Sequence, residues 1–250
     1  MSNSLLAVLG CGISFQSADI AQALAYENAD MKTDLLPANL RRRTSVATKM
    51  AFAAAQRACE SAAVKPSELS VIFTSALGEA AITDQLCRDI ARQDFPLSPT
   101  KFHNSVHNTA SGYWSIAVGS QHPAMAMAGY KDGFALALLE AWSQLHTIEK
   151  QILLVCYEET PSDLLLPDNQ WVACATAFVL SSKGRNGLSL HMPYCITDAT
   201  KSDQLDDKKH SPALAALPLY DALTQGNSGT IQISPESDQT WFIEVTNAHA

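Results

Sequence analysis

The sequence predicts an α/β protein in which one layered domain fills most of the chain. Apolar runs of strand length alternate with longer, alanine-rich segments of helical periodicity, an order typical of α/β layered domains. The strand candidates are apolar at nearly every position, which indicates strands covered on both faces. With 250 residues, 47% of them apolar and 17% charged, the chain can bury a sizeable core in one domain or one and a half.

The elements can be assigned in order from these patterns. Apolar residues at i, i+3 and i+4 in alanine-rich stretches predict helices over residues 19–28, 44–63, 81–93, 106–119 and 132–147. Continuous apolar runs predict strands over residues 5–13, 70–75, 124–128, 151–156, 173–181 and 187–194. The first run, LLAVLGC, could also begin a signal sequence of lipoprotein type, but no positive charge precedes it. We therefore interpret it as a buried first strand.

The character of the chain changes after Tyr194. Residues 196–210 are polar and charged, which favours a linker or a mobile surface loop. A short helix is expected from Ser211-Pro212 to Gly226, and the runs TIQIS and TWFIEV are expected to pair as a terminal hairpin. We therefore divide the chain into a main domain, residues 1–195, and a C-terminal extension, residues 196–250.

Composition excludes several classes of protein. The formal charge of −8 argues against general binding of nucleic acid, which needs a basic face, and mean hydropathy near zero argues against a membrane protein. The six cysteines include no C-x-x-C pair or zinc spacing, so we expect small core side chains of a reduced, cytoplasmic protein. These cysteines are Cys11, Cys59, Cys87, Cys156, Cys174 and Cys195.

The stretch from Ser98 to Ala141 carries the most specific pattern. A short apolar strand leads through Gly129-Tyr130 into a long apolar helix, and many α/β enzymes present a Ser or Cys at such a corner because a helix N-terminus stabilises negative charge. The stretch resembles the β-ketoacyl synthases, condensing enzymes of the thiolase-like superfamily. With one single-residue slip in spacing, the matching residues are Ser98, Pro99, Phe102, Ser105, Asn108, Gly112, Gly119, Pro123, Ala128 and Gly133. The nucleophilic cysteine of the family falls on Lys131.

The resemblance extends over roughly residues 5–192. LLAVLGCGIS looks like the family's first strand, Leu40–Ala62 like its first long helix, and Val71–Ala80 like the strand and turn ahead of a tunnel-lining helix. It ends where the second structural repeat of the synthases is expected to start. The resemblance thus implies a thiolase-like layered domain, essentially the N-terminal half of a β-ketoacyl synthase, with a short C-terminal extension.

The resemblance also implies a function. A synthase needs a Cys thiolate and two histidines from its second half, and none of the seven histidines here falls in those later motifs. We expect an inactive homologue like the short chain-length factors of type II polyketide and aryl polyene biosynthesis, which form a heterodimer with an active ketosynthase and shape its acyl tunnel. No cofactor and no metal are implied. An acyl carrier protein is the expected second partner.

Three groups of residues take roles from the resemblance. The expected tunnel residues are Leu77, Ala80, Ala81 and Phe102. The strand expected to meet the ketosynthase comprises Pro123, Ala124, Met125, Ala126, Met127 and Ala128. The residues expected to dock the acidic acyl carrier protein are Arg41, Arg42 and Arg43, which would otherwise form an ordinary solvated face.

Other interpretations of the sequence stay open. One is a thioester hydrolase of the same ancestry that uses Ser111 or Cys87, although no nearby base is identified; another is a scaffold that stabilises a ketosynthase without touching substrate. His103 and His107, four residues apart, could share a metal, but surface or capping roles are favoured. Two glycines in GCGISF are too few for a dinucleotide fingerprint. Trp114 is expected in the core.

Overall fold

A computed structural model describes residues 5–27, 29–183, 187–198, 211–235 and 239–247. Within these residues one sheet of nine strands forms the centre of the molecule. The strands are β1 (Leu6–Phe15), β2 (Ser70–Thr74), β3 (Ala124–Met127), β4 (Gln151–Glu158), β5 (Cys174–Ser181), β6 (Leu188–Leu190), β7 (Tyr194–Thr197), β8 (Gly229–Gln232) and β9 (Gln239–Asn247).

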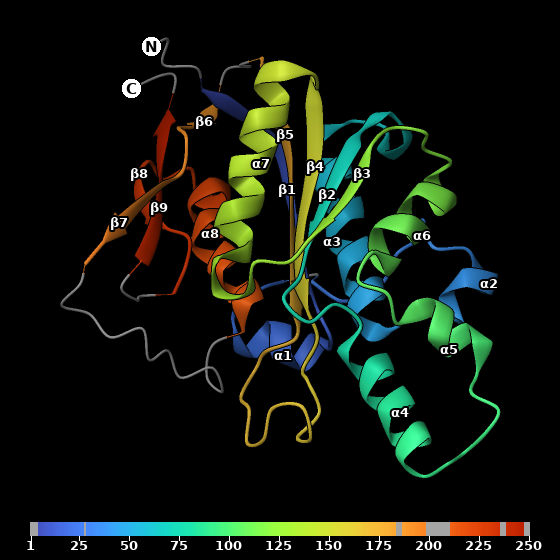
Figure 1. Ribbon diagram of the computed structural model, residues 1–250. Helices are drawn as coiled ribbons and strands as arrows, with labels where there is room; N and C mark the ends of the chain where they lie inside the picture. Colours follow the sequence, from blue (N-terminus) through green and yellow to red (C-terminus); the bar gives the residue numbers. More distant parts are fainter. Residues whose placement is uncertain (1–4, 28, 184–186, 199–210, 236–238, 248–250) are drawn as a thin grey trace.

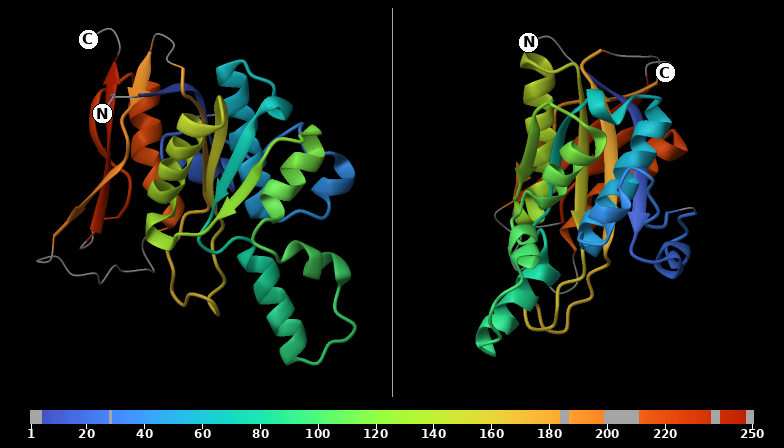
Figure 2. Two further views of the ribbon diagram at one scale, coloured as in Figure 1. Left: turned by 45° about the horizontal axis from the view of Figure 1, so that its top comes forward. Right: turned by 90° about the vertical axis from the view of Figure 1, so that its right-hand side faces the viewer.

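The α-helices are α1 (Ala18–Ala23), α2 (Ala38–Arg41), α3 (Val46–Ala62), α4 (Ala80–Ala91), α5 (Pro99–Asn104), α6 (Thr109–Val118), α7 (Gly133–Thr147) and α8 (Leu217–Gln225). Short 3₁₀ helices are η1 (Pro66–Glu68), η2 (Tyr130–Asp132) and η3 (Pro212–Ala216). Helices lie on both faces of the sheet, with α3 and α6 on one side and α7 on the other (Figures 1 and 2). This layered α/β arrangement is the one the sequence predicts.

The sheet is mixed. Its strands lie in the order β3-β2-β4-β5-β1-β6-β9-β7, and β8 pairs with β9. The pairs β3–β2 and β2–β4 are parallel, while β4–β5, β5–β1 and the pairs beyond them are antiparallel. Because β2, β3 and β4 run in one direction, their carboxyl ends lie together at one end of the sheet, the lower end in Figure 1. The candidate site is built at these carboxyl ends.

Two hydrophobic clusters fill the spaces on the two sides of the sheet. The first cluster, which contains Phe134, lies between the sheet and a layer formed by α7, η3 and α8. The second cluster, which contains Trp114, lies between the sheet and α3. Neighbouring residues of β2 alternate between them: Ile72 belongs to the first cluster, and Val71 and Phe73 belong to the second. The prediction of Trp114 as a core residue is confirmed, since its side chain is fully buried.

The two glycines of GCGISF have a packing role. A Cβ atom at Gly12 would lie 2.2 Å from the carbonyl oxygen of Ala54, and one at Gly10 would lie 2.4 Å from the backbone nitrogen of Ala62. Strand β1 therefore lies directly against the backbone of the alanine-rich helix α3. Only glycine permits so close an approach.

Most predicted strands are confirmed to within a few residues, as β1 to β5. The strand predicted over residues 187–194 is wrong as a single element, because β6 ends at Leu190 and β7 begins at Tyr194. Pro193 lies between them and has no N–H to donate to a sheet ladder.

The helices predicted over residues 81–93 and 132–147 are confirmed as α4 and α7. The helix predicted over residues 19–28 is too long, since α1 ends at Ala23. The first long helix begins at Val46 rather than 44, because Ser45 caps it by accepting a hydrogen bond from the backbone N–H of Thr48 at 2.9 Å.

The helix predicted over residues 106–119 begins only at Thr109, and it is preceded by α5, a helix that was not predicted. Helix α5 is only six residues long and carries no extended apolar periodicity. Pro99 at its first position, after the capping Ser98, is the signal that could have identified it.

The predicted helix after Ser211 is confirmed as η3 and α8, and the terminal hairpin as β8–β9. Much of the predicted linker, residues 199–210, lies outside the described residues. Strand β9 pairs with β6, so the extension continues the sheet of the main domain. The hydroxyl of Tyr26 also donates to the carboxylate of Asp221 at 2.9 and 3.0 Å, which ties α8 to the N-terminal region. The boundary at residue 195 stays a prediction.

Candidate functional site

The corner between β3 and α7 has a constrained backbone. Tyr130 adopts a positive φ of 48°, which is uncommon for a residue with a side chain. A Cβ atom at Gly129 would lie 2.9 Å from the Cα of Gly133, so glycine is needed for the chain to turn here. The hydroxyl of Thr74, at the end of β2, donates to the carbonyl of Gly133 at 3.3 Å. The start of α7 is thereby fixed to the carboxyl end of the neighbouring strand.

The position that the resemblance assigns to the nucleophile lies in this corner. Lys131 lies in η2, the 3₁₀ turn of this corner, one residue after the strained position. In the family pattern A-C-x-x-G, counting back from Gly133 places the cysteine on Tyr130, and the single-residue slip moves it to Lys131. Spacing from Gly133 is the sequence signal that could have singled out Tyr130. Neither residue carries a thiol, so both registers leave this position without a cysteine.

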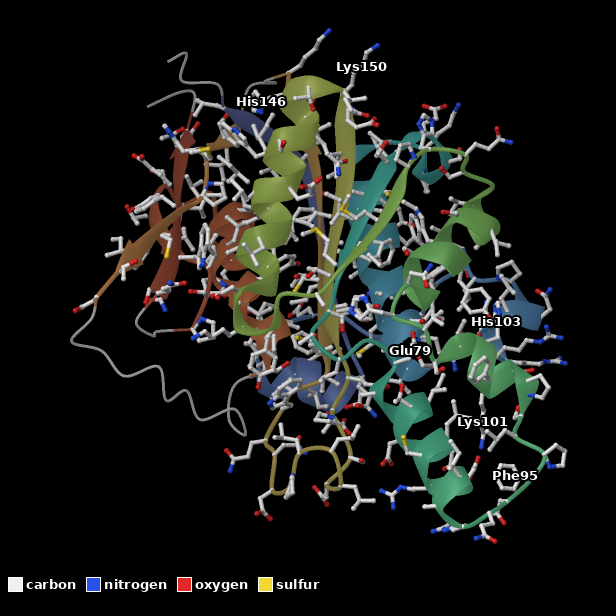
Figure 3. The ribbon with its side chains drawn as sticks, in the orientation of Figure 1. Glu79, Phe95, Lys101, His103, His146 and Lys150 are labelled. Atoms are coloured by element: carbon white, nitrogen blue, oxygen red, sulfur yellow. The ribbon has the colours of Figure 1, made fainter. Side chains whose placement is uncertain are left out.

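Three buried glutamates lie around the segment that joins β2 to α4. Glu158 ends β4, Glu159 follows it, and Glu79 precedes α4, where Figure 3 shows it between α3 and α4. All three side chains are buried. Burial raises the pKa of Glu158 to about 8 and that of Glu159 to about 7, although backbone N–H groups that donate to them oppose the shift. Burial likewise raises the pKa of Glu79.

The expected tunnel residues do not all face the same way. Leu77 is 37% exposed, Phe102 is 67% exposed, and Ala81 is also exposed, whereas Ala80 is 2% exposed. Ala80 thus contributes to the interior of this chain. Helices α4 and α5 form an arm that projects from the layered body (Figure 2), with Phe95 exposed on the loop between them (Figure 3).

The strand expected to meet a partner lies at the edge of the sheet. β3 hydrogen-bonds to β2 on one side, and on the other it is the last strand of the sheet order. Ala124 is exposed, Met125 is 37% exposed and Met127 is partly buried. Met127 also lines a groove of about 590 Å³ beside α7. The face is apolar and lacks a neighbouring strand within the described chain.

The three arginines differ from one another. Arg41 donates from its guanidinium to the carbonyls of Thr33 at 3.3 Å and Leu36 at 3.0 Å, so it holds the preceding loop in place. Arg42 and Arg43 are exposed. A cavity of about 310 Å³ beside Arg41 is also lined by Lys32, Thr33, Asp34 and Lys49. The region is positively charged. Unlike Arg41, Arg42 and Arg43 make no side-chain hydrogen bond that holds a neighbouring loop of the described chain.

The residues of the alternative interpretations lie apart. His103 is on α5, while His107 follows α5 and lies 2.9 Å through Nε2 from the carbonyl of Ser75, so the two do not share one helix face. Ser111 is buried in α6 and donates to the carbonyl of Asn108 at 3.1 Å. Cys87 is exposed on α4. This geometry favours structural roles for His107 and Ser111.

Two general features of the described residues bear on function. They contain no group of three or more His, Cys, Asp or Glu side chains arranged to hold a metal ion. No helix among them is long and apolar enough to cross a membrane.

The cysteines differ in burial. Cys59, Cys156 and Cys174 are buried as expected, while Cys87 and Cys195 are exposed and Cys11 is intermediate. Burial raises the pKa of the Cys59 and Cys174 thiols to about 12, which keeps them protonated.

Comparison with known proteins identifies a matching family profile and solved structures of similar fold. The profile described as "Beta-ketoacyl synthase, N-terminal domain" matches residues 16–242. A search of curated proteins found no match. Among solved structures, the fold is similar to a chain of the ketosynthase ApeO in complex with its chain length factor ApeC from Xenorhabdus doucetiae. That match has 18% identity and a TM-score of 0.70, and it covers 96% of this chain and 99% of the other.

Two further structures share the fold. One is the ishigamide ketosynthase/chain length factor, which matches with 13% identity and a TM-score of 0.63, over 89% of this chain and 73% of the other. The second is AntDE:AntF, a type II acyl carrier protein in complex with its ketosynthase, with 14% identity and a TM-score of 0.59, over 78% and 70%. At these identities the matches establish the fold alone.

Proposed function

The chain belongs to the family of β-ketoacyl synthase N-terminal domains, and on that premise we propose that it is a non-catalytic chain-length factor. It forms a heterodimer with an active ketosynthase and lines part of the shared acyl tunnel. The context is type II polyketide, aryl polyene or fatty-acid-like biosynthesis in the cytoplasm. One solved structure of similar fold is a chain from a ketosynthase and chain length factor complex. The match covers nearly all of both chains, so the two chains are of similar length.

The observation that carries the proposal is the corner without a thiol. The elements that present a nucleophile are all there: an edge strand, a strained residue and the N-terminus of a helix of 15 residues. Tyr130 and Lys131 occupy the place where a thiolate is needed. An amide between Lys131 and an acyl chain would be too stable to pass the chain on, and a phenol is a far weaker nucleophile than a thiolate.

The edge strand supports a partner of the same fold. An unpaired edge presents backbone N–H and C=O groups to which another strand can add, and soluble proteins usually block such edges with charge, proline or a covering element. β3 has the sequence AMAM, with no charge inside it. A second strand of this kind, supplied by a ketosynthase, would continue the sheet across the interface. Pro123 and Ala128 flank the strand and belong to the same proposed surface.

Exposed apolar side chains on α5 and ahead of α4 support contact with an acyl chain. Leu77 and Phe102 are both exposed. With Ala81 they line one side of the proposed tunnel once the partner covers them. In the scaffold interpretation the partner alone would cover these side chains, so the product lengths made by the complex distinguish the two interpretations. The hydrolase interpretation is weakened because Ser111 is buried and already engaged with Asn108.

The proposal is tested by co-expression with candidate ketosynthases from the same genome, followed by purification and incubation with acyl-loaded carrier protein. We expect a heterodimer in which the mass of this chain is unchanged, while the ketosynthase acquires the acyl group. Lys131→Cys and Tyr130→Cys should not restore condensation to the isolated chain, because a thiol alone supplies no acid or base for decarboxylation. A stable acyl adduct on the wild-type chain would overturn the proposal.

A further inference from the structure

The buried glutamates at the end of β4 hold the segment that joins β2 to α4. This segment, residues 75–79, and the first turn of α4 carry Leu77 and Ala81, the exposed residues of the proposed tunnel wall. Glu158 and Glu159 are consecutive, so their side chains reach different parts of the protein from one strand end. Both are almost fully buried, at 1% and 5% exposure.

Glu158 holds the start of the segment. Its Oε1 accepts a hydrogen bond from the backbone N–H of Ala76, and its Oε2 accepts one from Leu77 at 3.4 Å. The hydroxyl of Ser75 also hydrogen-bonds to this carboxylate, and the Ser75 oxygen accepts from the backbone N–H of Gly78 at 2.7 Å. One carboxylate therefore fixes the backbone on both sides of Ala76.

Glu159 holds the end of the segment. Its Oε1 accepts from the backbone N–H of Ala81 at 2.7 Å, in the first turn of α4, and it also accepts from the N–H of Ala47 in the first turn of α3. A carboxylate is favourable at a helix N-terminus, where N–H groups lack partners within the helix. Glu79 adds a third link between the same helices, because its Oε1 accepts from the hydroxyl of Thr48 at 2.6 Å. The start of α4 is therefore tied to the rigid helix α3.

Other titratable groups surround the three carboxyls. Those that act on them electrostatically are Tyr157 and Cys156 on β4, Cys174 on β5 and His107 before α6. Burial and the mutual repulsion of the carboxyls favour their protonated forms, whereas the N–H donors favour the ionised forms. The strength of their hold on residues 76–81 therefore changes with pH near neutrality.

We propose that Glu158 and Glu159 are positioning residues that fix the proposed tunnel wall, and thereby the length of chain that the complex releases. This inference rests on the proposed function, because it concerns the wall formed by Leu77 and Ala81. Without the carboxylates the backbone of residues 76–81 would sample displaced positions. The tunnel would then admit chains of several lengths where the wild type admits mainly one. Neither glutamate touches the acyl chain.

The first experiment measures the hold itself, by amide hydrogen exchange on the single chain at pH 9, where the Glu158 carboxyl is ionised. Glu158→Gln should speed exchange at Ala76 and Leu77 by on the order of tenfold, since a charged hydrogen-bond acceptor is replaced by a neutral amide oxygen. Exchange at Ala81 should stay as in the wild type. Glu159→Gln should give the opposite pattern. Glu68→Gln, at a largely exposed side chain, is the matched control and should leave all three amides unaltered. Unaltered exchange at Ala76 and Leu77 in Glu158→Gln would overturn the proposal.

The second experiment measures product lengths made by the complex with its ketosynthase at pH 6 and pH 9. Glu158→Gln should broaden the length distribution at pH 9, where the wild-type carboxyl is ionised, and should differ little at pH 6, where that carboxyl is protonated as the pKa of about 8 requires. Ala81→Phe serves as the reference. If Ala81→Phe shortens the product while Glu158→Gln leaves the lengths unchanged at both pH values, the positioning role is wrong and the proposed function stands.

If Ala81→Phe leaves the lengths unchanged, the proposed function fails, and the exchange experiment still decides whether the glutamates hold the segment. Should Glu158→Gln fail to fold, Glu159→Gln carries the exchange test at pH 9. Faster exchange at Ala81 with unaltered exchange at Ala76 supports the proposal, and unaltered exchange at Ala81 overturns it.

Discussion

Strands β2 and β3 are parallel neighbours in one sheet, yet they are built for different surroundings. Every residue of β2, SVIFT, is buried between the two helical layers. The facing residues of β3, AMAM, are exposed or partly buried, although Val71 pairs with Ala124 and Phe73 with Ala126. Bulky branched and aromatic side chains fill a finished interior, whereas small and flexible ones line an edge that another surface can cover.

The same difference separates α3 from α4. Most of α3 is buried against β1 and the rest of the sheet, whereas α4 buries only Ala80, Asp84 and Leu86. Ion pairs within the arm, such as Arg88 to Asp84 at 2.7 Å, stabilise it locally. The body around β2 and α3 thus completes its own core. The side formed by β3, α4 and α5 is the part of the described chain that a partner would complete.

The largest expected effect comes from placing the same charge on the two strands. Ile72→Asp buries an unpaired carboxylate in the core and should cost more than about 4 kcal/mol, enough to unfold the chain. Ala126→Asp lies at the edge, so it should change the stability of the single chain by less than about 1 kcal/mol. It should nevertheless abolish co-purification with the ketosynthase. Ala126→Ser is the control for a small polar change.

Circular dichroism melts and size-exclusion chromatography measure both outcomes. If Ala126→Asp still assembled at wild-type affinity, β3 would not be the interface. If Ile72→Asp remained folded, the distinction between a finished interior and an open edge would be lost.

An intermediate effect is expected on stability as pH changes. The pKa of Glu158, about 8, and that of Glu159, about 7, lie above the ordinary value of 4.5, so the folded chain retains protons that the unfolded chain releases. This contribution to stability is fully present below pH 4.5 and is lost as pH rises through about 7 to 8. Between pH 6 and pH 9 we expect a loss of roughly 2–4 kcal/mol.

Thermal melts of wild type and Glu158→Gln across this range test the expectation. A Gln side chain cannot ionise, so the variant should show a shallower fall in Tm, while the exposed Glu68→Gln should follow the wild type. Equal slopes for Glu158→Gln and wild type would mean that Glu158 does not titrate in this range.

The smallest effect concerns the arginines. Arg42→Glu with Arg43→Glu should weaken binding of an acyl carrier protein to the heterodimer by about tenfold at low salt, with the difference fading at high salt because exposed charges are screened. Arg41→Glu should in addition lower the Tm, since it removes the donors to Thr33 and Leu36. Titration calorimetry at two salt concentrations separates these contributions. Unchanged affinity at low salt would return Arg42 and Arg43 to an ordinary solvated face.

The sequence predicted the layered body well because its signals are local. Continuous apolar runs and the alanine spacing of α3 arise from burial, and both persist in the structure. Pro193 marks the break between β6 and β7 in the sequence, but the strand prediction over residues 187–194 depends on apolar runs alone and does not use it. The division of α5 from α6 depends on the cap at Ser98 rather than on periodicity.

The candidate site was predicted only in part. The corner after β3 was found by resemblance, yet the strained position proved to be Tyr130, next to Lys131. The burial of Ala80 could not be read from a turn of small residues. Glu158 and Glu159 were missed because their partners are backbone N–H groups far away in the sequence. No spacing within the chain marks such contacts.

Product length in the reconstituted complex tests the central claim most directly. Ala81 is exposed at the start of α4, so Ala81→Phe should leave the fold intact, whereas Phe at the buried Ala80 would first overpack the interior of the chain. With the ketosynthase and carrier protein supplied, mass spectrometry of the released chains should show shorter products from Ala81→Phe, with the first condensations nearly as fast as in the wild type. Products of unaltered length from a fully assembled variant would contradict the chain-length role and leave the scaffold interpretation in its place.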